Sequence, residues 1–340
     1  MNLLYTFRNG KNSNLGYYLR CYFRYFTPSI ISRWRLNSIL AEYEKLPAEQ
    51  KKEVDERVEY YCKLTPNTTI LPPDSETIGN HTLKNRKWNK KNRGIRYASP
   101  YFFDTQEHTR YFERNLKWKY CFGDVTYIPE VPAITKSRPL SNDNANSVIM
   151  KLDKNRHFVT IKDKVPFEKK CDLAIFRGLI SGCKANRHAL FERHLENERL
   201  DIGEVSNSAE VPDSWKKPLI TLYKHLEYKF IFALEGNDVA SNLKWVMSSN
   251  SVAIMPKPTC ETWFMEGKLI AGKHYIEIAA DYSDLNEKLK YYLERPEECK
   301  EIARNANEYV AQFQNKKREK LISLLVLKRY FEATSQTLSH

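Results

Sequence analysis

The stretch "KFIFALEGNDVASNLKWVMSSNSVAIM" (residues 229–255) decides the fold. It begins as an apolar strand, turns at Gly236, continues as an amphipathic helix and ends in a second apolar run, "SVAIM". A strand, turn, helix and strand in succession are typical of an α/β protein with a parallel sheet. The turn and the start of the helix are unusually polar, because they carry Glu235, Asn237, Asp238, Ser241 and Lys244.

The same alternation extends to both sides of this stretch. "DLAIFRGLISG" (172–182) predicts a buried strand that enters a glycine-flanked turn, and "NRHALFERHL" (186–195) predicts the helix that follows. "HYIEIA" (274–279) predicts another strand, followed by two helices and a final helix over 316–333. "SVIMKL" (147–152) and "HFVTI" (157–161) look like short strands, so we expect a doubly wound pattern from about residue 147.

The first part of the chain is different in character. Residues 15–46 mix aromatic side chains with arginines in a mostly helical pattern that breaks at Pro28, and residues 49–63 predict a charged helix. Residues 84–96 carry seven positive charges and no acid. A strand-like segment, "KYCFGDVTYIP", follows at residues 119–129.

Composition limits the partners and the compartment. The 340 residues carry a formal net charge of +13, which favours an anionic partner: nucleic acid, an acidic membrane surface or a phosphorylated substrate. The seven cysteines are scattered and include no C-x-x-C pair, which argues against a zinc or thioredoxin-like site and suits free thiols in a reducing cytosol. The N-terminus has too short an apolar core for a signal peptide, and no segment resembles a membrane span.

Two loops have the position at which open α/β sheets bind ligands, beyond the carboxyl ends of strands. The first contains Arg177 and Gly178, with Arg187 at the start of the next helix. The second is the turn after Gly236, whose glycine permits close backbone approach next to a helix N-terminus. With Lys244, these groups would form a diphosphate site. The alternative is that Gly236 only turns the chain and Ser241 only caps a helix.

Residues 166–313 resemble glycosyltransferase family 90. The similarity rests on "PFEKKCDLAIFRGLISG", on "YKFIFALEGNDVASNLKWVMSSNSVAIM" and on "HYIEIAADYSDLNEKLKYYLERPEECKEIARNANEYV". "EGND…SNLKW…SNS" and "ETWFMEGKL…HY" are closer to the bacterial, lipopolysaccharide-modifying branch. The similarity extends more weakly to "FGDVTYIPEVPAITKSRP" (122–139).

The resemblance implies a GT-B fold, with two Rossmann-like domains that face each other across a cleft. We expect an N-terminal acceptor-side domain over 1–160, a sugar-nucleotide-binding domain over 161–312 and a C-terminal helix over 313–340 that returns to the N-terminal domain. The implied activity is inverting transfer from a UDP-sugar to a hydroxyl of a bacterial surface glycan, with lipopolysaccharide core as the expected acceptor. The family requires no cofactor or bound metal, and we interpret "DYSD" (281–284) as helix capping.

The resemblance also implies roles for individual residues. The base that deprotonates the acceptor is Asp124, with Asp143 and Asp104 as the next candidates. Many relatives carry an arginine where this chain has Asn242, so either Asn242 donates a hydrogen bond instead or Arg187 and Lys244 supply the charge. The full set assigned to the donor diphosphate and nucleotide is Arg177, Gly178, Arg187, Gly236, Asn237, Asp238, Ser241, Asn242 and Lys244.

Two interpretations remain for each of Glu261, Trp263 and Arg138. Glu261 and Trp263 stand where the family places acidic and aromatic residues beside the donor sugar, or they mark a helix start with a core tryptophan. Arg138 is a contact to the acceptor or to the diphosphate. Arg156 and His157 lie near the expected cleft, and His157 is interpreted as a core histidine.

The basic and aromatic segments, 84–96 and 17–35, are either solvated faces or contacts to an anionic acceptor at a membrane. We therefore expect an enzyme of the cytoplasm, free or peripheral on the inner face of the cytoplasmic membrane. One alternative is a protein O-glycosyltransferase of the eukaryotic branch. Another, from a different class, is a basic nucleic-acid-binding protein, although the sequence contains no recognisable nucleic-acid-binding module.

Overall fold

The computed structural model describes residues 9–67, 69–82, 95–180, 185–206 and 208–337. The chain divides into two compact units. The first, which we call the sheet unit, comprises Met1–Asn12, Arg156–Thr259 and Met265–Gln312. The second, which we call the helical unit, comprises Ser13–Asn155, Cys260–Phe264 and Phe313–His340.

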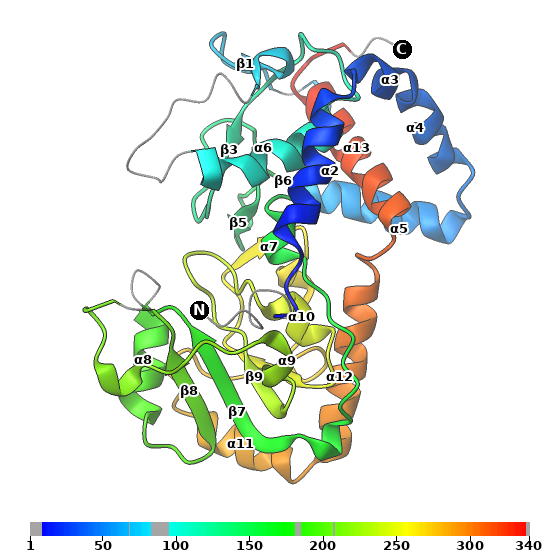
Figure 1. The fold of residues 1–340 in the computed structure, drawn as a ribbon. Coiled ribbons are helices and arrows are strands. Elements are labelled where there is room, and N and C mark those ends of the chain that lie inside the picture. The colour runs from blue at the N-terminus through cyan, green and yellow to red at the C-terminus, as the bar shows by residue number, and fades with distance from the viewer. Residues whose placement is uncertain (1–8, 68, 83–94, 181–184, 207, 338–340) are drawn as a thin grey trace. The chain divides into compact units, whose positions relative to one another are not determined.

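The sheet unit is built on a five-stranded parallel sheet (Figure 1). Its strands are β7 (Cys171–Gly178), β8 (Leu200–Glu204), β9 (Tyr228–Phe232), β10 (Val252–Met255) and β12 (Ile276–Glu277). Their order across the sheet is β12-β10-β9-β7-β8. The chain therefore runs outward from β7 to β8 and then returns to the other side of β7. This reversal puts a topological switch point between β7 and β9, where ligands of open α/β sheets bind.

Helices and apolar strand residues form the core of this unit. The helices are α8 (Ala185–His194), α9 (Leu222–His225), α10 (Leu243–Met247), α11 (Leu285–Leu293) and α12 (Pro296–Ala311), with 3-10 turns at Phe167–Lys169, Asp213–Trp215 and Glu266–Lys268. Phe176, Phe230 and Ile254 of the strands pack with Phe191 of α8 and Ile302 of α12. The central strands read as continuous apolar runs because helices cover both faces of a parallel sheet.

The helical unit has smaller sheets. Strands β3 (Tyr120–Cys121), β4 (Ala133–Thr135) and β6 (Ser147–Ile149) form a parallel sheet. Two antiparallel pairs join β1 (Glu76–Thr77) to β2 (Lys117–Trp118) and β5 (Ser137–Pro139) to β11 (Cys260–Thr262). The helices are α2 (Asn14–Phe26), α3 (Ser29–Trp34), α4 (Leu36–Glu44), α5 (Ala48–Tyr61), α6 (Ile95–Thr109) and α13 (Lys316–Ala333), with a 3-10 turn at Ile78–Asn80. The short α7 (Lys154–His157) spans the sequence boundary between the two units.

Helix α13 organises the interior of the helical unit, where it packs against α4, α5 and α6. Its buried Glu319 carboxylate lies 2.7 Å from the Arg57 guanidinium and 2.9 Å from Lys151 Nζ, and it accepts a hydrogen bond of 2.7 Å from Trp263 Nε1. The Trp263 indole stacks on the Tyr61 ring, with centroids 3.9 Å apart. A buried carboxylate beside two cations and an indole N–H has its charge compensated, which favours one position of α13 against its neighbours.

The mixed α/β class with parallel strands, predicted from the sequence, is confirmed. The strands expected within 172–182, 229–236, 251–255 and 274–279 are present as β7, β9, β10 and β12. The final helix has the predicted bounds, 316–333. These segments are long and apolar or strongly periodic, which is where pattern and structure agree best.

Other expectations of the sequence are corrected. "HFVTI" (157–161) is not a strand, and "SVIMKL" contributes β6 to the helical unit rather than to the five-stranded sheet. Within 119–129 only Tyr120–Cys121 is a strand. The amphipathic helix expected after the Gly236 turn, over "ASNLKWVM" (240–247), begins only at Leu243, because the preceding residues form a longer polar turn. Short apolar runs do not distinguish a strand from a buried irregular segment.

One buried ion pair gives a test of the sheet unit. Lys170 Nζ lies 2.8 Å from Asp163 Oδ2, and both side chains are at most 1% exposed. We expect Asp163→Asn to lower the free energy of unfolding by about 3–5 kcal/mol, because it leaves a buried ammonium without its counterion. Burial already lowers the pKa of Lys170. Urea denaturation followed by circular dichroism measures the change.

The matched control is Glu297→Gln, which breaks a surface pair with Lys300 in the same unit. Because that carboxylate is solvated, we expect no measurable change in the unfolding midpoint. The double variant Asp163→Asn/Lys170→Met should recover part of the lost stability, since it removes the unpaired ammonium and keeps an amide oxygen for the backbone N–H groups of Val165 and Asn250. A wild-type midpoint for Asp163→Asn would show that the pair does not stabilise the unit.

Candidate active site

One guanidinium joins the two loops at the switch point of the sheet unit. Arg187, on α8, donates to the carbonyl oxygen of Leu179 after β7 at 2.6 Å. It also donates to the carbonyl oxygens of Leu234 at 2.7 Å and Glu235 at 3.0 Å after β9. These bonds fix the loops that follow adjacent strands β7 and β9 relative to each other. The sequence-predicted Arg187 and the "EGND" turn therefore come together, as expected for a site beyond the carboxyl ends of strands.

Two glycines make room for this arrangement. A Cβ at Gly236 would lie 3.3 Å from Arg187 Nη2, and a Cβ at Gly178 would lie 2.8 Å from the Phe176 ring. The Phe176 ring is in turn 5.6 Å from the Arg187 guanidinium carbon. The "FRG" sequence thus supplies a ring beneath the guanidinium and a glycine that leaves space for that ring.

The polar side chains of the second loop hold the loop itself. The Glu235 carboxylate accepts hydrogen bonds from Thr259 N at 2.8 Å and Thr259 Oγ1 at 2.6 Å. Asn242 Nδ2 donates to the Phe232 carbonyl at 2.8 Å, which closes the turn between β9 and α10. Asn242, not Ser241, is the N-cap residue of α10, and its side chain makes no capping bond. Asp238 is buried, whereas Asn237 is exposed.

Arg177 is engaged with a neighbouring strand. Its guanidinium donates to Asp201 Oδ1 and to the Asp201 carbonyl, each at 2.7 Å, and its side chain is only 7% exposed. Lys217 and Tyr228 also donate to the Asp201 carboxylate. Partial burial opposes ionisation, but these hydrogen bonds outweigh it and lower the pKa of Asp201 to about 2. Arg177 therefore braces β7 against β8.

Lys244 is engaged in the interior. Its ammonium lies 2.5 Å from Glu266 Oε1, and both side chains are 2% exposed. The ammonium of Lys244, which the sequence predicts to bind the diphosphate, is thus paired with a carboxylate inside the sheet unit. A buried lysine that is paired with a buried carboxylate can hold a helix in position, but its charge is not available to a ligand in solvent.

In the helical unit, the loop after β3 presents the predicted base. Asp124 follows Gly123, whose φ of +114° lies in the region that favours glycine. Its carboxylate is 26% exposed and lies 2.5 Å from Nζ of Lys136, a lysine that is 1% exposed. The next residue, Val125, exchanges two hydrogen bonds of 3.1 Å with Ser137 Oγ. The loop is thereby held to β5 with one carboxylate reaching solvent.

Arg138 and Glu261, assigned separately from the sequence, are direct partners. They face each other across the β5–β11 pairing, with Arg138 Nε 2.8 Å from Glu261 Oε1, and both are at most 1% exposed. Arg138 also donates to the Tyr60 carbonyl at 2.7 Å, and the Tyr60 hydroxyl donates to Glu261. Trp263 is a core tryptophan, but it follows a strand rather than opening a helix. All three residues lie in the helical unit.

The remaining candidates are placed as follows. Asp104 is buried in α6, where it accepts hydrogen bonds from the Tyr17 hydroxyl at 2.8 Å and Lys154 N at 3.0 Å, and burial raises its pKa. Asp143 is exposed in the loop between β5 and β6. His157 is buried and Arg156 is exposed. Of the basic run 84–96, residues 84–94 lie outside the described residues.

Sequence reasoning missed Lys136, the partner of the predicted base. The sequence did contain a signal for Lys136. In "TKSRP", Lys136 and Arg138 are two residues apart in an extended segment, so their side chains lie on the same face of that segment. Across the described ranges, no group of three or more His, Cys, Asp or Glu residues has the geometry to hold a metal ion. In the "DYSD" segment, Asp284 precedes α11 but accepts from Ala279 N instead of capping the helix.

A parallel sheet with a braced loop pair at its switch point is the architecture of α/β proteins that bind a ligand at that edge. Comparisons with known proteins identify the family. Residues 144–332 match the model of glycosyl transferase family 90. The chain belongs to this family, and it is a glycosyltransferase.

Two relatives show how far the similarity extends. "O-glucosyltransferase LpsA" of Dichelobacter nodosus is 36% identical over 303 residues, which cover 88% of this chain and 90% of the relative. "Uncharacterized protein 179R" of Invertebrate iridescent virus 6 is 26% identical over 183 residues, which cover 42% of this chain and 15% of that protein. The match to the bacterial enzyme includes most of both units.

Arg187→Lys tests whether one guanidinium couples the two loops. Lysine keeps the charge but cannot reach three carbonyl oxygens in the same fork geometry. Because each hydrogen bond from a charged group contributes about 1.5–3 kcal/mol, we expect amide exchange near residues 179–180 and 234–237 to accelerate roughly tenfold or more. Hydrogen exchange with mass spectrometry measures it.

The control is Arg193→Lys on the same helix, α8. Arg193 is 53% exposed and lies 3.6 Å from Asp281, so we expect exchange in both loops to stay at wild-type rates. Equal exchange in the Arg187 and Arg193 variants would show that the loops do not depend on Arg187.

Proposed function

We propose that this protein is an inverting GT-B glycosyltransferase that moves a sugar from a UDP-sugar to a hydroxyl of a bacterial surface glycan, with lipopolysaccharide core as the acceptor. In this proposal the sheet unit binds the donor and the helical unit supplies the base. The name of the bacterial relative, an O-glucosyltransferase, makes glucose the first sugar to test. The observation that carries the proposal is the pair of loops that Arg187 joins at the switch point of the parallel sheet.

The donor assignment follows from the chemistry of the leaving group. Glycosyl transfer from a UDP-sugar releases a diphosphate, and positive charge close to that group stabilises the transition state. Arg187 offers a guanidinium directly beside Gly236, where a Cβ would lie 3.3 Å from Nη2, so the positive charge and the glycine of the turn lie at the same edge. We assign the diphosphate to this edge, with Asn237 and Ser241 as further polar contacts from the same turn.

Asn242 has a different role in the proposal from the arginine that its relatives carry. Its amide is used on the Phe232 carbonyl, so it holds the turn rather than supplying charge. The second explanation that the sequence left open was that Arg187 and Lys244 supply the charge; because Lys244 is paired with Glu266, we assign the charge to Arg187. We assign Arg177, Asp238 and Lys244 to the support of the loops, because their polar groups are buried.

The chemical step needs a base on the acceptor side. In a single displacement the acceptor oxygen attacks the anomeric carbon, the bond to the diphosphate breaks, and the acceptor proton passes to a base. We assign this base to Asp124, whose carboxylate reaches solvent on a loop held by Ser137, with Lys136 as the residue that positions it. In this assignment the packing of the same unit includes the buried side chains of Arg138, Glu261 and Trp263. The step requires no metal ion.

A screen of UDP-sugars tests the donor site. We expect UDP and one UDP-sugar to raise the midpoint of thermal unfolding, by the equivalent of about 2.7 kcal/mol at a ligand concentration 100 times Kd. Arg187→Lys should reduce this shift, whereas Arg193→Lys should not. If UDP and every UDP-sugar leave the midpoint unchanged, the donor assignment is wrong. Chelation of divalent metals should leave the shift unchanged.

Asp124→Asn tests the base. The variant should keep the UDP-sugar shift but transfer sugar about 10²–10⁴-fold more slowly, because the amide cannot accept the acceptor proton. Transfer is measured by sugar incorporation into lipopolysaccharide that lacks its outer core, and the anomeric configuration of the product is read by NMR.

The control for the base is Asp143→Asn, an exposed carboxylate in the same unit, for which we expect wild-type transfer. Undiminished transfer by Asp124→Asn would exclude Asp124 as the base. A product with the same anomeric configuration as the donor would contradict the inverting mechanism separately from the choice of residue.

A further inference from the structure

Helix α2 has two apolar faces, and only one of them belongs to the protein core. On the inner face, Tyr17 and Cys21 pack with Phe102 and Phe103 of α6. On the outer face, large apolar side chains recur at helical spacing and stay in solvent: Leu15 is 72% exposed, Leu19 62%, Phe23 79% and Phe26 76%. Folding of the helical unit does not account for this second face.

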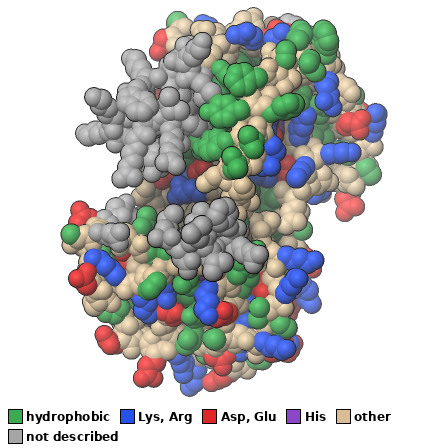
Figure 2. All heavy atoms as spheres, in the orientation of Figure 1, with side chains coloured by type: hydrophobic (Ala, Val, Ile, Leu, Met, Phe, Trp, Pro, Cys, Tyr) green, Lys and Arg blue, Asp and Glu red, His purple; other side chains and the backbone are tan. Residues whose placement is uncertain are grey.

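The outer face continues onto α3. Tyr22, Ile30 and Ile31 are exposed, and Trp34 is 75% exposed. Eight of the sixteen exposed large hydrophobic side chains found among the described residues therefore come from residues 15–34. Figure 2 shows hydrophobic side chains gathered on the face that carries α2 and α3 in Figure 1. A patch of this density marks an interaction site rather than ordinary surface.

Arginines surround these apolar side chains. Residues 13–36 contain Arg20, Arg24, Arg33 and Arg35 but no acidic residue. Arg24 is paired with Glu107 at 2.6 Å. Within the described part of the chain, no carboxylate lies within ion-pairing distance of Arg20, Arg33 or Arg35. The face is therefore both apolar and positively charged.

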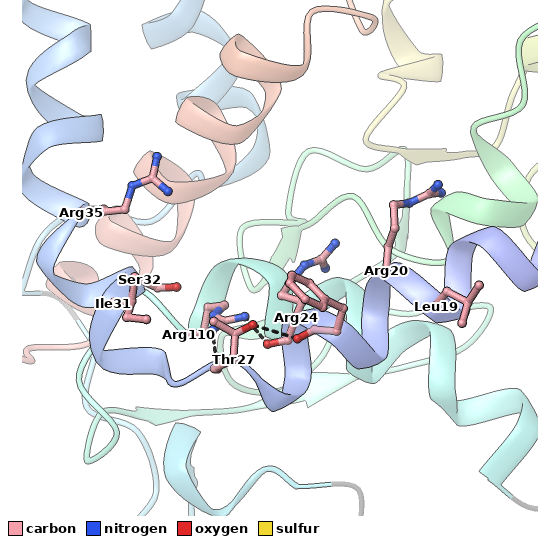
Figure 3. A pocket seen from close by; sticks show the side chains of 9 residues that line it. Leu19, Arg20, Arg24, Thr27, Ile31, Ser32, Arg35 and Arg110 are labelled. Atoms are coloured by element: carbon pink, nitrogen blue, oxygen red, sulfur yellow. Dashed lines mark hydrogen bonds between the residues drawn. The ribbon is translucent and has the colours of Figure 1, made fainter.

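A groove between α2 and α3 brings the two kinds of side chain together (Figure 3). It has a volume of about 730 Å³. Its lining residues are Leu19, Arg20, Phe23, Arg24, Thr27, Ile31, Ser32, Arg35 and Arg110. Arg110 is buried and donates to the Thr27 carbonyl at 2.7 Å, so it fixes the corner between the helices. Figure 3 shows Arg20 and Arg35 at the two ends of this groove.

We infer that the outer face of α2 and α3, which we call the docking face, lies in the interfacial layer of an anionic lipid bilayer. Leucine, phenylalanine and tryptophan side chains enter the boundary between headgroups and acyl chains, and the arginines bind lipid phosphates. Helix α2 has 13 residues, about 20 Å at 1.5 Å per residue, which suits a helix that lies in the plane of the surface. Among the described residues, no helix is long and apolar enough to cross a membrane.

Charge argues against a second copy of the chain as the occupant. In a two-fold symmetric dimer the same face would meet itself, so the arginines of one copy would oppose those of the other. Anionic lipid offers both the apolar layer and the opposite charge. None of the residues of the docking face is assigned to the donor or to the base, and the inference holds for any sugar or acceptor.

Vesicle sedimentation of the full chain tests the docking face. We expect binding to vesicles of phosphatidylcholine with about one-third phosphatidylglycerol, little binding to phosphatidylcholine alone, and weaker binding as salt rises. Phe23→Ser/Trp34→Ser should weaken binding about 10- to 100-fold, because two exposed apolar side chains no longer enter the bilayer. Arg20→Gln/Arg35→Gln should weaken it about 30-fold, at roughly fivefold for each charge near the surface.

Two matched controls use exposed side chains outside the docking face. Ile70→Ser removes an apolar side chain that is 85% exposed, and Arg304→Gln removes an arginine that is 67% exposed. Both should bind vesicles like the wild type. The thermal shift with UDP should be the same in all four variants, which separates loss of membrane binding from loss of donor binding.

Four outcomes would overturn the inference. Equal binding to neutral and anionic vesicles would exclude the charge contribution. Wild-type vesicle binding by both docking-face variants would place the contact elsewhere. Light scattering that shows a dimer, dissociated by Phe23→Ser/Trp34→Ser and indifferent to vesicles, would make a second copy the occupant. Displacement by inorganic phosphate beyond that of chloride at equal ionic strength would assign the groove to free phosphate.

Discussion

The sheet unit depends on one guanidinium that satisfies three carbonyl oxygens at once. Loops after parallel strands have backbone oxygens that the sheet cannot pair, so water or a side-chain donor must satisfy them. Arg187 supplies the donors for the loop after β7 and for the turn after β9. Because the planar fork of arginine fixes the directions of its bonds, the two loops take one relative position. The same atoms that stabilise the edge also bring positive charge to it.

In the helical unit, buried ion pairs likewise fix the relative positions of segments that are far apart in the sequence. The Glu319 carboxylate contacts Arg57, Lys151 and the Trp263 indole. Arg138 pairs with Glu261 across two strands that are far apart in the sequence. Such pairs contribute little net stability compared with apolar packing, but they penalise any arrangement that leaves one partner alone. They therefore specify which segments meet. The Asp124 loop is attached to elements whose register these pairs fix, which is the rigidity that the proposed role of Asp124 as base requires.

The sequence predicts this structure well where a pattern is long, and poorly where a role depends on a distant partner. The apolar strands β7, β9 and β10 and the amphipathic α13 follow from periodicity alone. The loops of the candidate site also follow, because their place after parallel strands is a topological consequence. The partners of Arg177, Lys244 and Arg138 do not follow, since Asp201, Glu266 and Glu261 are 22 to 123 residues away in the chain. From sequence alone, a basic residue beside a phosphate looks the same as one buried against a carboxylate.

Helix α2 shows a second reason why periodicity is incomplete. A helix that is apolar all round is expected to be buried in a core or a membrane. The two faces of α2 differ in this respect. Tyr17 and Cys21 pack against α6 in the core of the helical unit, whereas Leu19 and Phe23 are exposed to solvent. In the described part of the chain, no carboxylate lies within ion-pairing distance of Arg20 on α2 or of Arg33 and Arg35 at α3, and a layer of lipid phosphates would supply the missing anions. Under the proposed function, a glycosyltransferase held at an anionic bilayer would meet a membrane-bound acceptor by two-dimensional diffusion, so a weak acceptor site would be sufficient.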